Sequence, residues 1–231
     1  WAQSAFNLHE NTIERQSQAR EVSPIAVDTV FGDQISHFDG SVSFSQVDIA
    51  VPGNDALPVE LRRTLRVEDR SRANGHFLGG FGEWALDLPR LSSEVSVAYG
   101  WRPAAGTVSQ RCSLPGPLPS SGTMAAEDYW SGYSLQIPGA GGQQLLMNPS
   151  GTLPAAGGGP YPWITQDMWR IACKSSTKNG YAGEAFIALS PQGVKYTLDW
   201  VVTRTHAPIN GNLGTMTSPR QVVHFLVSRI E

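Results

Sequence analysis

The sequence has few charged residues, only two cysteines and no long apolar run. Asp, Glu, Lys and Arg make up 16% of its 231 residues, below the quarter or so that soluble domains carry on average. This low charge disfavours a disordered charged chain and a heavily solvated helical bundle. No apolar run reaches the ~18 residues that suggest a transmembrane helix, so we predict no membrane span. The net charge of −3 and the pI near 6.0 also argue against nucleic-acid binding.

Motifs of common catalytic sites are missing as well. The sequence contains no G-x-S-x-G, H-E-x-x-H, G-x-x-x-x-G-K or G-x-G-x-x-G pattern, and its five histidines are scattered. Glu83 and Asp87 flank Trp84, but carboxylates four residues apart on a strand are separated by about 13 Å, too far for a glycosidase pair. We therefore predict no enzyme, no catalytic residue and no cofactor.

Acidic residues near turns raise the question of a bound cation. Oxygen-rich clusters attract calcium, but the spacing here is not that of an EF-hand, and turn capping by Asp side chains is the interpretation we favour. We therefore predict no metal site among these residues: Asp28, Asp33, Asp39 and Asp48.

Turn-forming residues and short alternating runs dominate what is present. Glycine (24) and proline (16) are abundant without a collagen-like period, and alternating runs such as Tyr133-Leu135-Ile137 lie between turn dipeptides. A phase shift near Gln46 indicates a bulge or a twist. The expected fold class is all-β: an antiparallel β-sandwich or meander-like sheets, with long Gly/Pro-rich loops and little helix.

Composition divides the chain unevenly. Residues 1–22 are polar with few apolar anchors and form either a short helix or a loosely tethered arm. Residues 23–231 read as one β-rich domain, with a possible lobe boundary in the Gly/Pro-rich stretch near residues 150–162. The chain begins at Trp1 without an initiator Met or a signal peptide, which we interpret as a processed or trimmed segment.

Two features predict how the domain is held together. Trp84, Leu86 and Leu88 share one face of a predicted strand and are expected to lie in the core. Cys112 and Cys173 form no C-x-x-C unit, and we expect them to form a disulfide, the alternative being two buried free thiols. A loop of this length closed by a disulfide gains about 4–5 kcal/mol in the chain-entropy model.

Seven tryptophans are many for this length. Exposed aromatic rings stack on sugars, but in β domains aromatic residues more often cover the core. The candidates for sugar stacking are Trp101, Tyr129, Trp130 and Trp163, together with Tyr133 and Tyr161. A separate cluster of arginines, interleaved with Asp and Glu, favours a solvated strand edge that blocks edge-to-edge pairing: Arg62, Arg63, Arg66, Arg70 and Arg72.

Several short motifs, beginning with Gly32-Asp33 and Pro52-Gly53 and ending with Pro219 to Glu231, follow one another in an order that resembles the N-terminal segment of Rhs/YD-repeat proteins. Gly32-Asp33 resembles the family's G-D-P-V entry, with Gln34 in place of the proline. Further matches follow in family order: Pro52-Gly53, Leu57-Pro58-Val59, Arg62-Arg63-Thr64, Phe81 to Leu88, the hairpin Ser190 to Asp199, and Pro219 to Glu231.

This resemblance implies a β-rich segment that starts or plugs a YD-repeat shell. Such shells enclose a C-terminal toxin or present adhesive surfaces, and no catalytic residue of the family maps onto this segment. The expected partners are other β-sheet segments of the parent protein or another copy, and the expected location is secreted or at the cell surface. The alternative from the residues themselves is a secreted carbohydrate-binding module that binds glycans through exposed Trp and Tyr.

Overall fold

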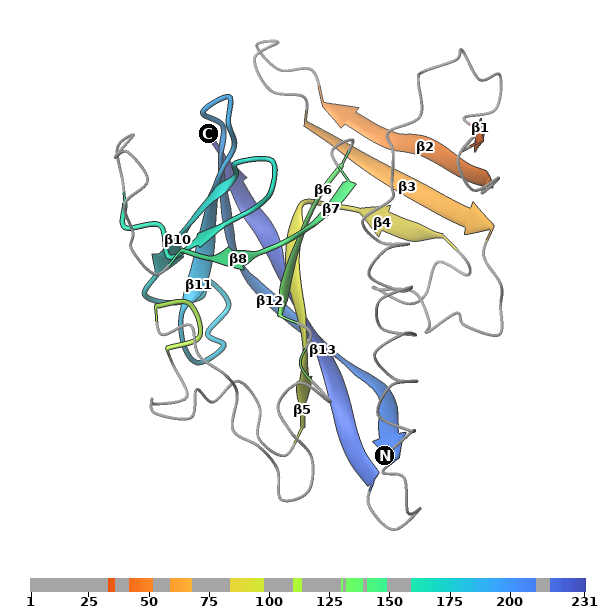
Figure 1. Cartoon of the computed structure of the whole chain (residues 1–231). Helices are drawn as coiled ribbons and strands as arrows, with labels where there is room; N and C mark the ends of the chain where they lie inside the picture. The colour runs from red at the N-terminus through yellow and green to blue at the C-terminus, as the bar shows by residue number, and fades with distance from the viewer. Residues whose placement is uncertain are drawn as a thin grey trace. The chain divides into compact units, whose positions relative to one another are not determined.

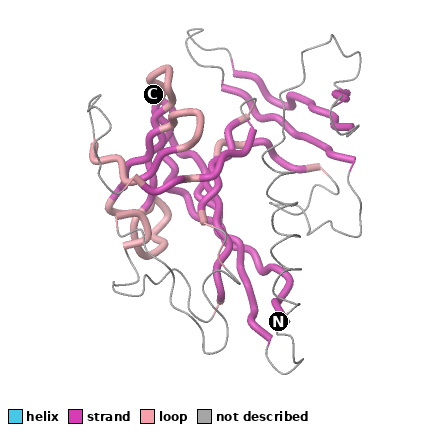
Figure 2. The backbone as a smooth tube through the Cα atoms, viewed as in Figure 1, coloured by secondary structure: helices cyan, strands magenta, loops and turns pink. Residues whose placement is uncertain are grey.

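The computed structural model describes residues 33–35, 42–51, 59–67, 84–97, 110–113, 130, 132–138, 141–148, 159–210 and 217–231. All regular secondary structure among these residues is β-strand (Figures 1 and 2). The sheets are antiparallel, which confirms the predicted all-β class. The arm predicted at residues 1–22 lies outside the described residues.

The chain divides into two compact units. The first unit spans residues 1–87 and 137–143, and the second spans residues 88–136 and 144–231. The division after Asp87 differs from the predicted lobe boundary, since residues 150–162 fall within the sequence range of the second unit.

The first sheet is a meander of four strands in sequence order, as the turn-rich pattern predicted. Its strands are β1 (Asp33–Ile35), β2 (Val42–Val51), β3 (Val59–Val67) and β4 (Ala85–Asp87). The β2–β3 hairpin forms most of this sheet, because β1 and β4 are short.

The second sheet has nine strands in the order β7-β6-β5-β13-β12-β11-β10-β9-β8. They are β5 (Arg90–Ser96), β6 (Tyr133–Ile137), β7 (Gly141–Gln144), β8 (Leu146–Met147), β9 (Trp163–Ile164), β10 (Arg170–Lys174), β11 (Ala185–Leu189), β12 (Lys195–Asn210) and β13 (Thr217–Ile230). The long β12–β13 hairpin, blue in Figure 1, lies at its centre.

The second sheet curls until it almost closes. Its two outermost strands, β7 and β8, are consecutive in the chain and separated only by Leu145. The Leu145 amide donates to the Tyr133 carbonyl of β6 at 2.8 Å, while Leu146 and Met147 pair with β9. One stretch of chain therefore contacts β6 first and β9 next, and so joins the two edges of the sheet.

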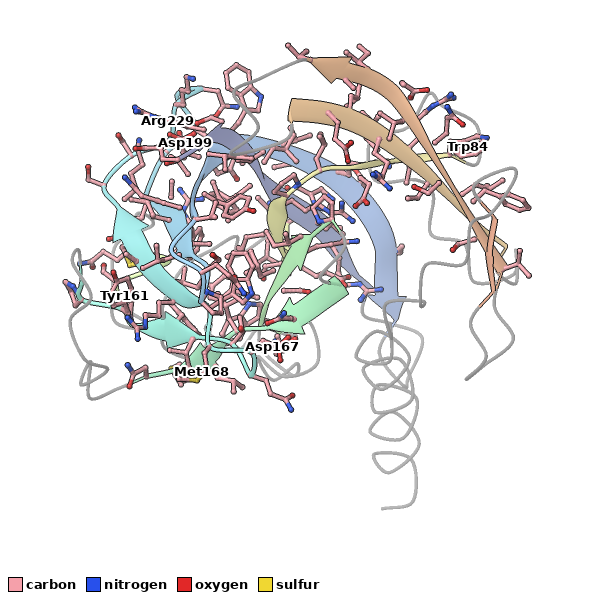
Figure 3. All side chains as sticks on the ribbon, turned by 90° about the horizontal axis from the view of Figure 1, so that it is seen from above. Trp84, Tyr161, Asp167, Met168, Asp199 and Arg229 are labelled. Carbon is pink, nitrogen blue, oxygen red and sulfur yellow. A yellow bond between two sulfur atoms is a disulfide. The ribbon has the colours of Figure 1, made fainter. Side chains whose placement is uncertain are left out.

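Side chains fill the space inside this curled sheet (Figure 3), and four of them are aromatic rings in contact with one another. Tyr133 contacts Trp163 with ring centroids 4.8 Å apart and Phe186 at 5.5 Å, and Phe186 contacts Phe225 at 5.0 Å. All four are buried. Apolar residues from the surrounding strands complete this core: Leu91, Val95, Leu135, Ile171, Ala185, Ala188, Leu198, Val201 and Val223.

A short segment around Arg111 and Cys112 packs where β6, β9 and β11 begin and β10 ends. Cys112 forms a disulfide with Cys173 of β10, the pairing that the sequence predicted. The Tyr133 hydroxyl donates to the Arg111 carbonyl at 2.7 Å, and the Trp163 indole N–H donates to the Cys112 carbonyl at 3.0 Å. Cys112, Arg111 and their partners thus tie this closing segment (residues 110–113) to several strands at once.

The β11–β12 hairpin forms where the sequence predicted a hairpin. The turn lies at Pro191-Gln192-Gly193, where the Ser190 amide donates to the Val194 carbonyl at 2.8 Å and the Gly193 amide donates to the Ser190 carbonyl at 3.0 Å. Gly193 has a φ of +91°, a conformation that glycine adopts without steric cost.

Candidate interaction surface

The first sheet has one apolar and one polar face. In β3, Leu61 and Leu65 lie on one face and Glu60 and Arg62 on the other, because successive residues of a strand point in opposite directions. The pairings of β2 and β4 with β3 extend the first of these faces. We call the following set the apolar face: Phe44, Ile49, Val51, Leu61, Leu65 and Leu86.

A β-bulge at Asp48 keeps the end of β2 on this face. The register passes from Val47 opposite Arg62 to Ile49 opposite Leu61, so that Asp48 is an extra residue in β2. Without it, Ile49 and Val51 would point to the polar face. The phase shift seen in the sequence near Gln46 therefore reflects a real bulge, two residues further on.

The members of the apolar face are not fully buried. Phe44, Leu61, Leu65 and Leu86 are half-buried, and none of them belongs to the core. Ile49 and Val51 at the end of β2 are 54% and 53% exposed. A sheet with one apolar face gains stability by burying it against a second layer, and at this end of β2 that layer is incomplete.

A charged pair lies among these apolar side chains. Arg63 donates to both carboxylate oxygens of Asp48, from Nε at 2.5 Å and from Nη2 at 2.7 Å. The Arg63 guanidinium also lies 5.2 Å from the centroid of the Trp84 ring, a cation–π distance. The Asp48 carboxylate is therefore neutralised within the sheet, and it holds Arg63 close to the surface of the sheet.

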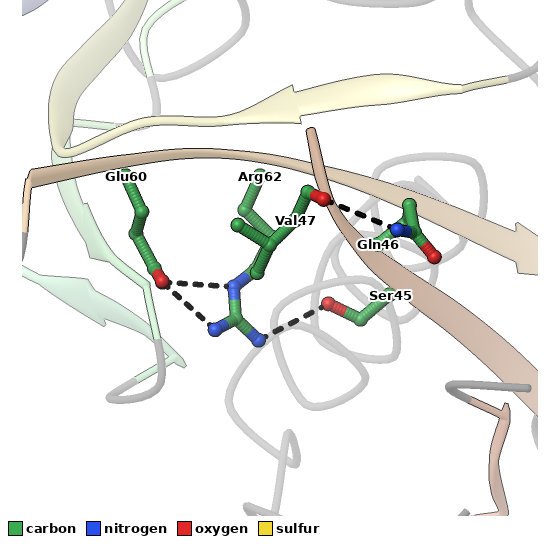
Figure 4. Close-up of polar contacts among 5 residues, drawn as sticks. All are labelled: Ser45, Gln46, Val47, Glu60 and Arg62. Atoms are coloured by element: carbon green, nitrogen blue, oxygen red, sulfur yellow. Dashed lines mark hydrogen bonds and ion pairs between the residues drawn. The ribbon is translucent and has the colours of Figure 1, made fainter. Parts of the chain in front are cut away.

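On the polar face, Arg62 is held in the same way. Its guanidinium donates to Glu60 Oε1 at 2.8 Å and 3.1 Å and to Ser45 Oγ at 3.3 Å (Figure 4). Gln46, which pairs with Arg63 and therefore lies on the other face, donates from its side chain to the Val47 carbonyl beside it. These contacts are about one-third exposed, so each contributes at most about 1 kcal/mol. Acidic neighbours neutralise Arg62 and Arg63 as predicted, but both residues pair with β2 on one side and with β4 on the other, so the predicted strand edge is wrong at these two positions.

The predicted core residues Trp84, Leu86 and Leu88 are half-buried, so their assignment to the core was wrong. Leu86 lies in β4, the short edge strand of the first sheet, and an edge strand is covered on fewer sides than a central one. Trp84 instead lies against Arg63. Periodicity identified the shared face of Trp84 and Leu86 correctly but not its degree of burial.

The proposed sugar-stacking residues are divided between the core and the part of the chain that is not described. Trp101 and Tyr129 lie outside the described residues. Trp130 is half-buried, and its indole N–H donates to Ser93 Oγ at 3.0 Å. The other three are 3–4% exposed and do not present a stacking surface: Tyr133, Tyr161 and Trp163.

Two aromatic residues that sequence reasoning missed are exposed instead. Trp200 on β12 is 45% exposed and Tyr181, before β11, is 37% exposed. Trp200 follows Asp199, where the β12–β13 register shifts. That shift is not visible in the sequence, and the alternation of β12 did not distinguish Trp200 from a core residue.

Two further searches concern metal ions and membranes. Among them, no group of three or more His, Cys, Asp or Glu side chains is arranged to hold a metal ion. Within the same residues, no helix has the length and apolarity to cross a membrane. Asp48, one of the acidic residues considered for calcium, binds Arg63.

Comparison with known proteins does not extend the structural evidence. Neither a scan against protein-family models nor searches of curated proteins and of solved structures found a match to this chain.

Proposed function

We propose that this chain is a non-catalytic structural module of a large exported protein of the Rhs/YD-repeat type. In this proposal it helps to start or seal a β-shell that encloses a toxin or presents a surface. The observation that carries the proposal is the apolar face of the first sheet, which ends in the exposed side chains of Ile49 and Val51. A neighbouring sheet would supply the second layer that such a face requires.

The second unit supports a scaffolding role. Its interior is packed with the rings of Tyr133, Trp163, Phe186 and Phe225, as a rigid scaffold requires. The disulfide between Cys112 and Cys173 supports export, because disulfides persist in oxidising compartments.

The first test is the parent gene. We expect it to encode YD repeats beyond Glu231, and a parent without them would contradict the proposal. The second test is binding between this chain and the purified YD-repeat segment of the same parent. Ile49→Lys places a charge on the apolar face and is expected to weaken binding at least tenfold.

Trp200→Lys is the matched control for this binding test, because Trp200 is also a large exposed apolar residue but lies in the second unit. It should leave binding unchanged. Equal weakening by Ile49→Lys and Trp200→Lys would show that the apolar face has no special role.

A carbohydrate-binding module remains the second candidate, now supported by the exposed rings of Trp200 and Tyr181 rather than by Tyr133, Tyr161 or Trp163. A glycan array distinguishes the two proposals. Binding to a defined glycan that is lost in Trp200→Ala would favour this candidate over the structural module.

A further inference from the structure

β2 changes its surroundings halfway along its length. Val42, Ser43 and Phe44 pair with β1 on one side and with β3 on the other. From Gln46 to Val51, the pairing found within the described part of the chain is with β3 alone. The side chains at the end of this half are exposed: Asp48, Ile49, Ala50 and Val51.

We propose that two copies of this chain associate edge to edge through the ends of their β2 strands, which pair antiparallel about a two-fold axis at Ala50. This inference rests on the proposed use of the first sheet as an assembly surface and names a partner for it. The two first sheets would then form one continuous sheet, a recurrent way in which β-proteins satisfy an edge strand.

The sequence of β2 is self-complementary about Ala50. With Ala50 on the axis, Ile49 of one copy faces Val51 of the other, and the reverse pair follows by symmetry. Both residues belong to the apolar face, so the two faces join without a polar interruption. Cross-strand pairs of β-branched side chains of this kind stabilise a sheet.

The bulge and the charge of Asp48 exclude the two registers on the N-terminal side of Ala50. An axis at Asp48 would place two carboxylates directly opposite each other, which is destabilising. An axis at Ile49 would pair Val51 with Val47, which lies on the polar face on the other side of the bulge. With the two-fold axis at Ala50, the two Asp48 residues do not face each other, and each keeps its ion pair with Arg63 of its own copy.

A two-fold contact of this kind closes on itself and stops at a dimer. The bulge at Asp48 interrupts the regular edge next to the contact, and bulges commonly limit edge pairing. The contact is therefore short, and we expect it to depend on protein concentration.

The test is site-directed cross-linking of the whole chain. Ala50→Cys introduces one thiol at the proposed axis, while both natural cysteines are joined to each other. Under mild oxidation, or with a short bismaleimide, Ala50→Cys is expected to form a covalent dimer. Adding Ile49→Lys to Ala50→Cys should reduce the yield of dimer at least fivefold.

Gln46→Cys is the matched control, since Gln46 is exposed on the same strand. Four residues from the axis, two such thiols would lie about 27 Å apart and should not cross-link. Equal cross-linking of Gln46→Cys and Ala50→Cys would reveal random collision, and no cross-linking of Ala50→Cys would exclude the dimer; either result overturns the inference.

The same variants separate this inference from the proposed function. If Ala50→Cys does not cross-link but Ile49→Lys still weakens binding to the YD-repeat segment, the dimer is wrong and the structural module stands. If the dimer forms and the YD-repeat segment does not bind, the apolar face serves self-association and the proposed function fails.

Discussion

The ring of Tyr133 on β6 lies 5.5 Å from the ring of Phe186 on β11, although β5, β13 and β12 separate these strands in the sheet. Strands so far apart in the order meet only because the sheet curls around its own interior. Phe186 also contacts Phe225 of β13 at 5.0 Å. Phe186 is therefore the ring through which opposite sides of the curled sheet are packed together.

Phe186→Ala should lower the free energy of unfolding by about 3–5 kcal/mol, because it leaves a cavity where a fully buried ring packs against two others. Trp200→Ala is the aromatic control and should cost about 1 kcal/mol or less, since Trp200 is 45% exposed. Urea unfolding followed by circular dichroism measures both. Equal losses would mean that the interior packing around Phe186 does not hold the second unit.

The sequence predicted the strands better than it predicted how they close. The stretch from Ser190 to Asp199 was recognised as a hairpin, and it forms the turn and the start of β12, because turn signals are local. The closure of the sheet depends instead on Leu145, where the chain leaves β6 and joins β9. Nothing in a short run such as Leu145-Leu146-Met147 indicates a change of partner.

The degree of burial of each side chain was the second property that the sequence did not predict. Period-two alternation shows which side chains share a face but not what covers that face. Trp84 and Trp163 both lie in short strand-like segments, yet Trp84 is half-buried beside Arg63, whereas Trp163 is 3% exposed inside the second sheet. The difference is set by tertiary neighbours distant in sequence, so the candidate site on the first sheet emerged only from the structure.

Gly183→Ala should be more destabilising than an ordinary substitution in a turn. Gly183 has a φ of +101°, and a Cβ at this position would overlap the Arg111 guanidinium. Arg111 is buried, donates to the Ala182 carbonyl and lies over the Phe225 ring at 5.5 Å. These contacts and its burial leave the Arg111 side chain little freedom to move. Burial also lowers the pKa of Arg111, which the nearby Tyr181, Tyr133 and Glu184 partly offset.

Gly193→Ala is the control that measures backbone strain without an overlap of the kind expected between Gly183→Ala and Arg111. Gly193 also has positive φ, at +91°, but a Cβ there meets no atom within 4 Å, so the variant should lose only the strain of about 1–2 kcal/mol. Thermal or urea unfolding of the two variants gives the difference between them. If Gly183→Ala costs no more than Gly193→Ala, Arg111 is not fixed against this backbone.

The Glu184 side chain binds backbone amides of the closing segment. Its Oε2 accepts hydrogen bonds from the amides of Cys112 at 2.8 Å and Ser113 at 2.9 Å. Glu184→Ala leaves both amides without this acceptor and should cost about 1–3 kcal/mol. Glu184→Gln keeps a carbonyl oxygen in place and should cost less.

The rate at which a dithiol reduces the disulfide gives a second measurement of this contact. Loosening of the closing segment in Glu184→Ala should expose Cys112, which is fully buried, and reduction should be faster than in Glu184→Gln. Identical reduction rates in the two variants and in the wild type would show that Glu184 does not control access to the disulfide.

His224 should make the second unit sensitive to acid. It lies on β13 opposite Ser92 of β5 and Val202 of β12, and is 7% exposed. Burial, together with the positive charges of Arg90 and Arg204, lowers the pKa of His224 from 6.5 to about 3. The ion pair of Arg220 with Glu94 lies nearby on the same two strands, β13 and β5.

The direction of the effect follows from proton binding. The unfolded chain protonates His224 below about pH 6.5, whereas the folded chain keeps it neutral down to about pH 3, so stability is present above pH 6.5 and is lost as the pH falls through this window. Between pH 7 and pH 5 this single group should lower the free energy of unfolding by about 2 kcal/mol.

His224→Gln cannot take up this proton, so its free energy of unfolding, measured in urea at both pH values, should fall by about 2 kcal/mol less than that of the wild type. Groups elsewhere titrate alike in both proteins and cancel in the comparison. Parallel losses in the wild type and His224→Gln would show that His224 is not held neutral by the fold, and a larger loss in the variant would reverse the sign of the argument.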